Sequence, residues 1–171
     1  NATPWLQGDE FDAVMNYEFA RALVKFFVDH KQRISPTQLD STLAAVRASY
    51  PREINYILQN LIDSHDTDRL PSMIINPDRR YDDRNSPRWN PDYIVRKPNA
   101  FEIRRQKLIV LFQMTYVGAP MIYYGDEAGM WGADDPDDRK PMLWSDLMYE
   151  NEKSCPLKNC SRPEDRNVFD D

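Results

Sequence analysis

Short apolar runs along the chain alternate with stretches of helical periodicity. Residues 13–15 are apolar and give way to a polar residue at Asn16. Two further runs, residues 54–64 and the stretch between Gly118 and Gly125, are nearly continuous in apolar character. Such runs are typical of strands buried on both faces, although the front half of 54–64 also fits a helix. We therefore expect three buried strands.

Three segments carry apolar residues at the three-and-four spacing of an amphipathic helix. They are residues 18–30, 34–51 and 100–116. Ser35, directly before a proline, is a start signal for the second helix, and Pro51 marks its end. The pattern thus predicts the order strand, helix, helix, strand, loop, helix, strand, loop, which is typical of parallel βα units.

The segment between the second strand and the third helix is long and polar. Residues 76–99 contain four prolines and many charges, so we expect an irregular excursion. Loops of this length in a compact domain are usually either functional or disordered. From Gly132 onward the chain again lacks a long periodic stretch.

Each predicted strand ends in polar or ionisable side chains. The first ends at Asn16, the second at His65 and Asp66, and the third at Asp126 and Glu127. The carboxyl ends of parallel strands meet at one edge of a sheet, where α/β proteins bind ligands. This placement predicts a functional cleft there, while a local capping pair after the second strand remains an alternative for His65 and Asp66.

Composition narrows the classes of partner. The net charge is −6 and the sequence pI is about 5.0, with arginines scattered among acids. We expect no nucleic-acid partner, because phosphate binding relies on clustered Lys and Arg. No apolar run approaches the roughly 18 residues that a membrane-spanning helix needs, so we expect no membrane association.

The two ends of the chain say little about the compartment. The sequence begins at Asn1 without an initiator Met or a leader, so we expect that a preceding segment was removed and leave the localisation undetermined. Cys155 and Cys160 near the C-terminus could form a small disulfide or remain two free thiols. Without a second Cys/His pair they make a poor metal site.

Four stretches of the chain form a recognisable set: "WLQGDEFDAVMNYEF", "NLIDSHDTDRL", "GAPMIYYGDEAGM" and "DDPDDRKPMLW". In this order they resemble four segments of the α-amylase family of glycoside hydrolases: the approach to the sixth barrel strand, the strand ending in His-Asp, the eighth strand and the loop after it. Ser64, directly before the His-Asp pair, narrows the resemblance to the neopullulanase, cyclomaltodextrinase and maltogenic amylase group.

The resemblance implies an α/β fold, a partial (β/α)8 barrel with about strands six to eight and their helices. Residues 1–171 would be one fragment of the catalytic domain, with no complete second domain. It also implies a retaining enzyme that cleaves α-glucosidic bonds in starch-type glucans, pullulan or cyclodextrins. The nucleophilic Asp and the acid Glu would lie upstream of Asn1, so we expect the isolated fragment to be inactive.

The same resemblance implies roles for individual residues. Asp66 would stabilise the transition state on the sugar being cleaved, and His65 would bind a hydroxyl of that sugar. Asp135 and Arg139 would hold a further glucose, although a solvated charge run explains their segment equally well. The implied partner is an α-glucan oligosaccharide. No cofactor or metal is expected in this chain, and calcium stays open for the full-length parent.

Other residues near these positions invite structural interpretations. We expect Arg69 to pair locally with an acid such as Asp68, and Asp126 with Glu127 to brace the rim of the barrel. Asn16 could line the cleft or make a structural hydrogen bond. Three tryptophans could stack on sugar faces or simply pack, namely Trp5, Trp89 and Trp131.

Two alternatives to a hydrolase segment remain open. An inactive relative used as a binding or scaffold protein would share the fold, and a self-standing α/β sugar-binding module would need three strands to form a complete sheet. If the chain is a barrel fragment, its outer strands have unpaired apolar edges, and we expect self-association.

Overall fold

The computed structural model describes residues 2–7 and 9–148, so Cys155 and Cys160, for which a disulfide and two free thiols were both left open, lie outside the described residues. Within these ranges the chain is mostly helical with two short parallel strands. The elements in chain order are η1 (Thr3–Trp5), α1 (Tyr17–Leu23), the π-helical η2 (Val24–Val28), α2 (Pro36–Ala48), η3 (Ile54–Tyr56), β1 (Gln59–Asn60), α3 (Leu70–Ile75), α4 (Ala100–Thr115) and β2 (Ala119–Pro120).

Three extended segments run parallel to one another, as the apolar runs predicted. β1 pairs with β2 in the register Gln59 to Ala119, and Met15 forms a parallel bridge to Gln59 on the other side. The backbone N–H of Asn16 donates to the Gln59 carbonyl at 2.8 Å, and the N–H of Met121 donates to the Asn60 carbonyl at 3.0 Å. β1 is therefore the central segment of the three.

The strands are much shorter than predicted. The run between Gly118 and Gly125 is a strand only over Ala119–Pro120, and residues 124–129 form turns instead. The run 54–64 begins with the 3-10 helix η3, which confirms the helical alternative for its front half. A strand is maintained by its ladder of hydrogen bonds, and among the described residues that ladder extends over only two positions of each strand.

Polar caps start the helices. The Ser35 side chain accepts from the backbone N–H of Gln38, whose side chain in turn accepts from the Ser35 N–H, so the predicted start of α2 is confirmed as a capping box. Asn99 and Glu102 form the same reciprocal pair at the start of α4. The Asn16 side chain accepts from the Phe19 N–H at the start of α1. Each cap satisfies backbone donors that the helix itself leaves unpaired.

The sequence pattern missed α3. All six residues of Leu70–Ile75 are buried, and a proline lies in the first turn. A helix that is buried on every side shows no polar face, and six residues give fewer than two turns. Hydrophobic periodicity therefore carries no signal for this element.

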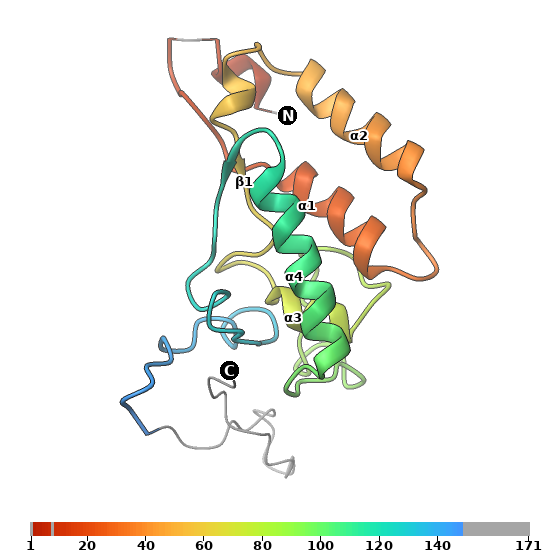
Figure 1. Cartoon of the computed structure of the whole chain (residues 1–171), viewed down its shortest axis with the longest axis vertical. Helices are drawn as coiled ribbons and strands as arrows, with labels where there is room; N and C mark the ends of the chain where they lie inside the picture. The colour runs from red at the N-terminus through yellow and green to blue at the C-terminus, as the bar shows by residue number, and fades with distance from the viewer. Residues whose placement is uncertain (1, 8, 149–171) are drawn as a thin grey trace.

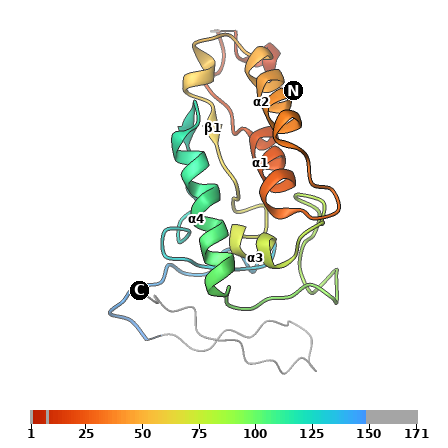
Figure 2. The same cartoon turned by 45° about the vertical axis from the view of Figure 1, so that its right-hand side comes forward.

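The core lies between α1, α3 and α4. Figure 2 shows α1 and α4 on either side of the chain that passes through β1, and both Figure 1 and Figure 2 show α2 alongside α1. One hydrophobic cluster joins side chains from these elements: Phe19, Ala22, Leu23, Val24, Val28, Leu39, Leu43, Ile62, Leu70, Met73, Ile74 and Ile109. The loops that follow the extended segments lie at the end of the molecule opposite to η1 (Figure 1).

The excursion of residues 76–99 is irregular, as predicted, yet it is tied to the body. One carboxylate oxygen of Asp78 accepts from the backbone N–H groups of His30, Lys31 and Gln32 at 2.9, 2.6 and 3.3 Å. Tyr93 and Val95 are buried in a second small cluster with Trp131 and Ala133. Among the described residues no helix is long and apolar enough to cross a membrane.

Candidate functional site

A tight turn follows β1 and carries the first two candidate residues. The backbone N–H of Ser64 donates to the Thr67 hydroxyl at 3.0 Å, and the N–H of Asp66 donates to the Ser64 hydroxyl at 3.2 Å. Ser64 and Thr67 are fully buried, while the His65 and Asp66 side chains are 52% and 51% exposed. The turn therefore holds its polar anchors inside and presents the imidazole and the carboxylate to solvent.

The four predicted site residues come together. Asp66 Oδ1 lies 3.3 Å from His65 Nε2 and 3.6 Å from an Nη of Arg139, whose Nε lies 2.8 Å from Asp135 Oδ1. His65 and Asp66 are separated from Asp135 and Arg139 by about 70 positions of sequence, so the fold brings two distant segments into one cluster. All four side chains are about half exposed.

Arg69 links the turn that carries Asp66 to the segment that carries Asp135 and Arg139. Its partners correct the expectation that it pairs with a neighbouring acid such as Asp68. It is fully buried and does not pair with Asp68. Its Nη1 donates to the Tyr124 carbonyl at 2.8 Å and to Asp126 Oδ1 at 3.2 Å, and its Nε donates to the Asp138 carbonyl at 3.0 Å. The guanidinium also lies 4.4 Å from the centroid of the Tyr123 ring.

The backbone adds one more bond, because the Arg69 N–H donates to the Gly132 carbonyl at 3.0 Å. Residues 124–138 are thereby fastened to the turn that carries Asp66. Gly132 is also anchored by its own N–H, which donates to the Ser72 hydroxyl at 3.0 Å. Arg69 is therefore a buried clamp between the two segments that form the cluster.

Asp126 has the structural role expected for the rim. Besides Arg69 it hydrogen-bonds the side chain of Asp63, which also accepts from the Leu70 N–H at 2.6 Å. Burial, and then the negative charge of Asp63, raise the pKa of Asp126 well above its ordinary value. Burial also raises the pKa of Asp63, so two carboxyl groups whose ionised forms are disfavoured lie together beside the positive charge of Arg69.

A second buried network ties the excursion to the cluster. Asp68 accepts from the Tyr93 hydroxyl at 2.7 Å and from the Asn85 side-chain amide at 3.3 Å. The backbone of Asn85 pairs with Asp134: its N–H donates to an Asp134 carboxylate oxygen at 3.1 Å, and its carbonyl accepts from the Asp134 N–H at 3.0 Å. Burial raises the pKa of Asp68 to about 7.

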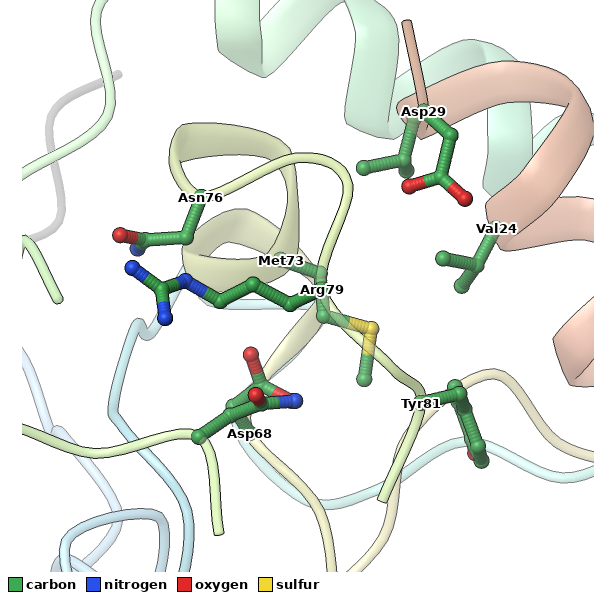
Figure 3. Close-up of a pocket in the computed structure, with 9 residues that line it drawn as sticks. Val24, Asp29, Asp68, Met73, Asn76, Arg79 and Tyr81 are labelled. Carbon is green, nitrogen blue, oxygen red and sulfur yellow. The ribbon is translucent and has the colours of Figure 1, made fainter. Parts of the chain in front are cut away.

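A small cavity lies beneath this network (Figure 3). Asp68, Arg79 and Asn85 contribute polar groups to its wall, and Val24 and Met73 contribute apolar ones. Its volume is about 10 Å³, roughly the room that one water molecule requires. A cavity of this size cannot hold a sugar.

Several other candidates have structural roles. The Asn16 amide donates to Asn60 Oδ1 at 2.9 Å and is buried, which favours the structural alternative. Trp131 is 1% exposed and cannot stack on a ligand, whereas Trp5 and Trp89 are 54% and 55% exposed. Among the described residues no group of three or more His, Cys, Asp or Glu side chains is arranged to hold a metal ion.

Comparison with known proteins identifies the family. Residues 1–170 match the model of the alpha amylase catalytic domain. The chain belongs to the alpha-amylase family.

Two similar members of the alpha-amylase family are a cyclomaltodextrinase and a neopullulanase. The cyclomaltodextrinase of Geobacillus thermopakistaniensis is 40% identical over 144 residues, which are 84% of this chain and 20% of the relative. Neopullulanase 2 of Thermoactinomyces vulgaris is 38% identical over 146 residues, 85% of this chain and 20% of the relative. The chain thus spans about a fifth of the length of these relatives and corresponds to part of their catalytic domain.

A solved structure of an alpha-amylase-family relative has a similar fold. It is the cyclic alpha-maltosyl-(1→6)-maltose hydrolase of Arthrobacter globiformis, in complex with cyclic alpha-maltosyl-(1→6)-maltose. The identity is 30% and the TM-score is 0.60 over 83% of this chain and 26% of that protein. The segment described above therefore has the fold of a partial alpha-amylase barrel.

Proposed function

We propose that this chain supplies one side of the active site of a retaining glycoside hydrolase that cleaves α-glucosidic bonds in starch-type glucans, pullulan or cyclodextrins. One observation carries the proposal: Asp66 lies within 3.6 Å of both His65 and Arg139, at the exposed end of three parallel segments. The residues to which the family resemblance assigns sugar binding thus form one accessible cluster.

Asp66 is the transition-state stabiliser in this proposal. Its carboxylate accepts hydrogen bonds from hydroxyls of the sugar being cleaved, and these bonds strengthen as the ring gains positive charge. His65, 3.3 Å away, donates to a neighbouring hydroxyl of the same sugar. The buried turn beneath them fixes both side chains before the substrate arrives, so little reorganisation is needed in the transition state.

Asp135 and Arg139 bind the next part of the glucan. The 2.8 Å contact between Arg139 Nε and Asp135 Oδ1 orients the guanidinium. A guanidinium supplies several N–H donors and a carboxylate two acceptor oxygens, which suits this pair to binding sugar hydroxyls. Because Arg139 also contacts Asp66, a sugar at this pair is adjacent to the one at Asp66.

In the parent enzyme the three extended segments correspond to barrel strands six, seven and eight. Their parallel order along the chain and the helices α1 and α4 that follow the first two support this assignment. The nucleophilic Asp and the acid Glu belong to the preceding part of the barrel. The isolated chain is therefore inactive, and hydrolysis belongs to the full-length enzyme.

Related structures support a glucan ligand. The Arthrobacter globiformis hydrolase was solved with cyclic alpha-maltosyl-(1→6)-maltose and with maltose, and a Nostoc punctiforme debranching enzyme was soaked with acarbose. By analogy the substrate of this chain's parent is an α-linked glucan.

The Asp66→Asn variant of the full-length enzyme tests the proposal. Replacing the carboxylate with an amide of the same size removes the charge that the transition state requires, so kcat on β-cyclodextrin should fall by about 10²- to 10³-fold. Release of reducing sugar measures the rate, and the melting temperature should be unchanged because Asp66 is half exposed.

Asp40→Asn is the matched control. Asp40 is an exposed acid on α2, and its replacement should leave kcat within twofold. Wild-type turnover by Asp66→Asn would refute the role of Asp66. A full-length wild-type protein that binds the glucan without hydrolysing it would instead support the scaffold alternative.

A further inference from the structure

We propose that the exposed side of residues 82–89 is an additional sugar-binding surface, on which Trp89 stacks against a glucose unit beyond the one held by Asp135 and Arg139. The proposal rests on the proposed function, because it extends the same site toward longer glucans. It assigns a substrate-binding role to the excursion of residues 76–99, none of whose residues belongs to the cluster of four site residues.

The excursion is fastened directly beside the cluster. The two hydrogen bonds between Asn85 and Asp134, at 3.1 and 3.0 Å, fix the middle of the segment one residue away from Asp135. Asn85 and Asp134 are both buried, so this junction is part of the folded body. Residues 82–84 before this junction and residues 88 and 89 after it are exposed, whereas Ser86 is buried with Asn85.

Charges on both sides of Asn85 act on the acids of the site. Before it, Asp82 lies close enough to Asp134 and Asp66 that, after burial, their charges contribute to raising the pKa of its carboxyl group. After it, the positive charge of Arg88 lowers the pKa of Asp137, which burial otherwise raises. Charges on both sides of Asn85 therefore lie within electrostatic range of Asp66 and of the loop that carries Asp135.

Trp89 is held in place but remains accessible. Its backbone N–H donates to the Ser86 carbonyl at 3.1 Å, and the side-chain amide of Asn90 donates to the Arg84 carbonyl at 2.7 Å, so residues 84–90 form a compact turn. The Arg84 guanidinium lies 4.8 Å from the centroid of the indole ring, which is 55% exposed. One face of the ring is thus supported by a cation, and the accessible remainder can receive a ligand.

The distance along the chain limits how far Trp89 can be from the cluster. Trp89 is four positions beyond Asn85, and a fully extended chain over four positions spans at most about 14 Å. A glucan of a few units extending from Asp135 and Arg139 can therefore reach the ring. An indole offers a large, flat apolar surface that matches the C–H face of a glucose ring, while Arg88 and Asp82 offer partners for hydroxyls.

Trp89→Ala in the full-length enzyme tests the proposal with two substrates. Loss of one aromatic contact should raise KM for maltoheptaose by about 2- to 10-fold, with kcat within twofold. Maltotriose is too short to span the cleavage site and the ring, so its kcat/KM should stay within twofold of wild type. Trp89→Phe should restore most of the affinity for maltoheptaose.

Trp5→Ala is the matched control, because Trp5 is 54% exposed and belongs to η1 at the opposite end of the molecule (Figure 1). It should leave both substrates unaffected. Wild-type kinetics of Trp89→Ala on maltoheptaose, or equal losses on both substrates, would overturn the proposal. The proposed function fails separately if the wild-type enzyme hydrolyses neither substrate, and isothermal titration of wild type and Trp89→Ala with maltoheptaose then decides the role of Trp89 alone.

Discussion

Asp138 is the residue whose side chain is least well satisfied in the described part of the chain. It is fully buried, and neither of its carboxylate oxygens has a hydrogen-bond partner there. Burial raises its pKa to about 7, because the protein interior disfavours the charged form. Its backbone carbonyl accepts from Arg69, so the same residue helps to position the loop next to Arg139.

A neutral replacement of Asp138 should make the chain less sensitive to alkaline pH. The folded chain keeps a proton on Asp138 up to about pH 7, whereas the unfolded carboxyl loses it near the ordinary value of 3.8. Below about pH 4 the carboxyl is protonated in both states and costs the folded state nothing. As the pH rises from about 4 through 7, ionisation of the unfolded state lowers the stability of the folded state. Asp138→Asn should match wild type at pH 4 and melt at a higher temperature at pH 8.

Thermal unfolding of this chain, followed by circular dichroism between pH 4 and pH 8, measures the effect. Asp40→Asn is the control and should show no difference from wild type that grows with pH. A constant difference between Asp138→Asn and wild type across the whole range would show that the Asp138 carboxyl does not titrate there.

Family resemblance grouped residues that are distant in sequence, and the roles assigned to those residues stay predictions. The resemblance placed His65, Asp66, Asp135 and Arg139 in one site, and the structure brings them together. Reasoning from local charge, in contrast, gave Arg69 the wrong partner. It paired Arg69 with its neighbour, but the true partner lies 57 positions away. Adjacent opposite charges look like a pair in sequence, and only the fold reveals which of them are buried together.

At the scale of elements, the caps were the most informative local signals. Ser35 before Pro36 marked the start of α2 correctly because a cap depends on residues three positions apart. Strand lengths were overestimated because the hydrogen-bond ladder of a strand depends on its neighbouring strands, which the local sequence pattern does not specify. The buried helix α3 was missed because its residues carry no amphipathic pattern.

A side chain at Gly118 should destabilise the pairing of the two strands. Gly118 has φ +125° directly before β2, and a Cβ there would meet the Asn60 side chain and lie 2.9 Å from the Leu58 carbonyl. Gly118→Ala should therefore disrupt the pairing of β1 with β2 and lower the free energy of unfolding by about 2–4 kcal/mol. Urea unfolding of the chain measures the loss.

Gly129→Ala provides a control with similar backbone strain. Gly129 also has positive φ, +69°, but a Cβ there would meet nothing within 4 Å, so the cost should be only about 1 kcal/mol. Equal losses for the two variants would mean that the close approach of Gly118 to β1 contributes nothing to stability.

At the scale of the whole molecule, the chain has the arrangement of a barrel segment that leaves apolar surface uncovered. Four side chains on α4 are between 50% and 58% exposed, namely Phe101, Leu108, Leu111 and Met114. In the described residues β2 pairs only with β1, so one of its edges lacks a neighbour. The self-association expected from unpaired edges stays a prediction.

The relation of the four-residue cluster to substrate is the central claim, and an experimental structure of the full-length enzyme with a bound maltooligosaccharide tests it most directly. We predict that the Asp66 carboxylate and His65 Nε2 lie within hydrogen-bond distance of hydroxyls on one sugar, with Asp135 and Arg139 on the adjacent sugar. A glucan bound in the active site with Asp66 out of reach of any sugar hydroxyl would contradict the account.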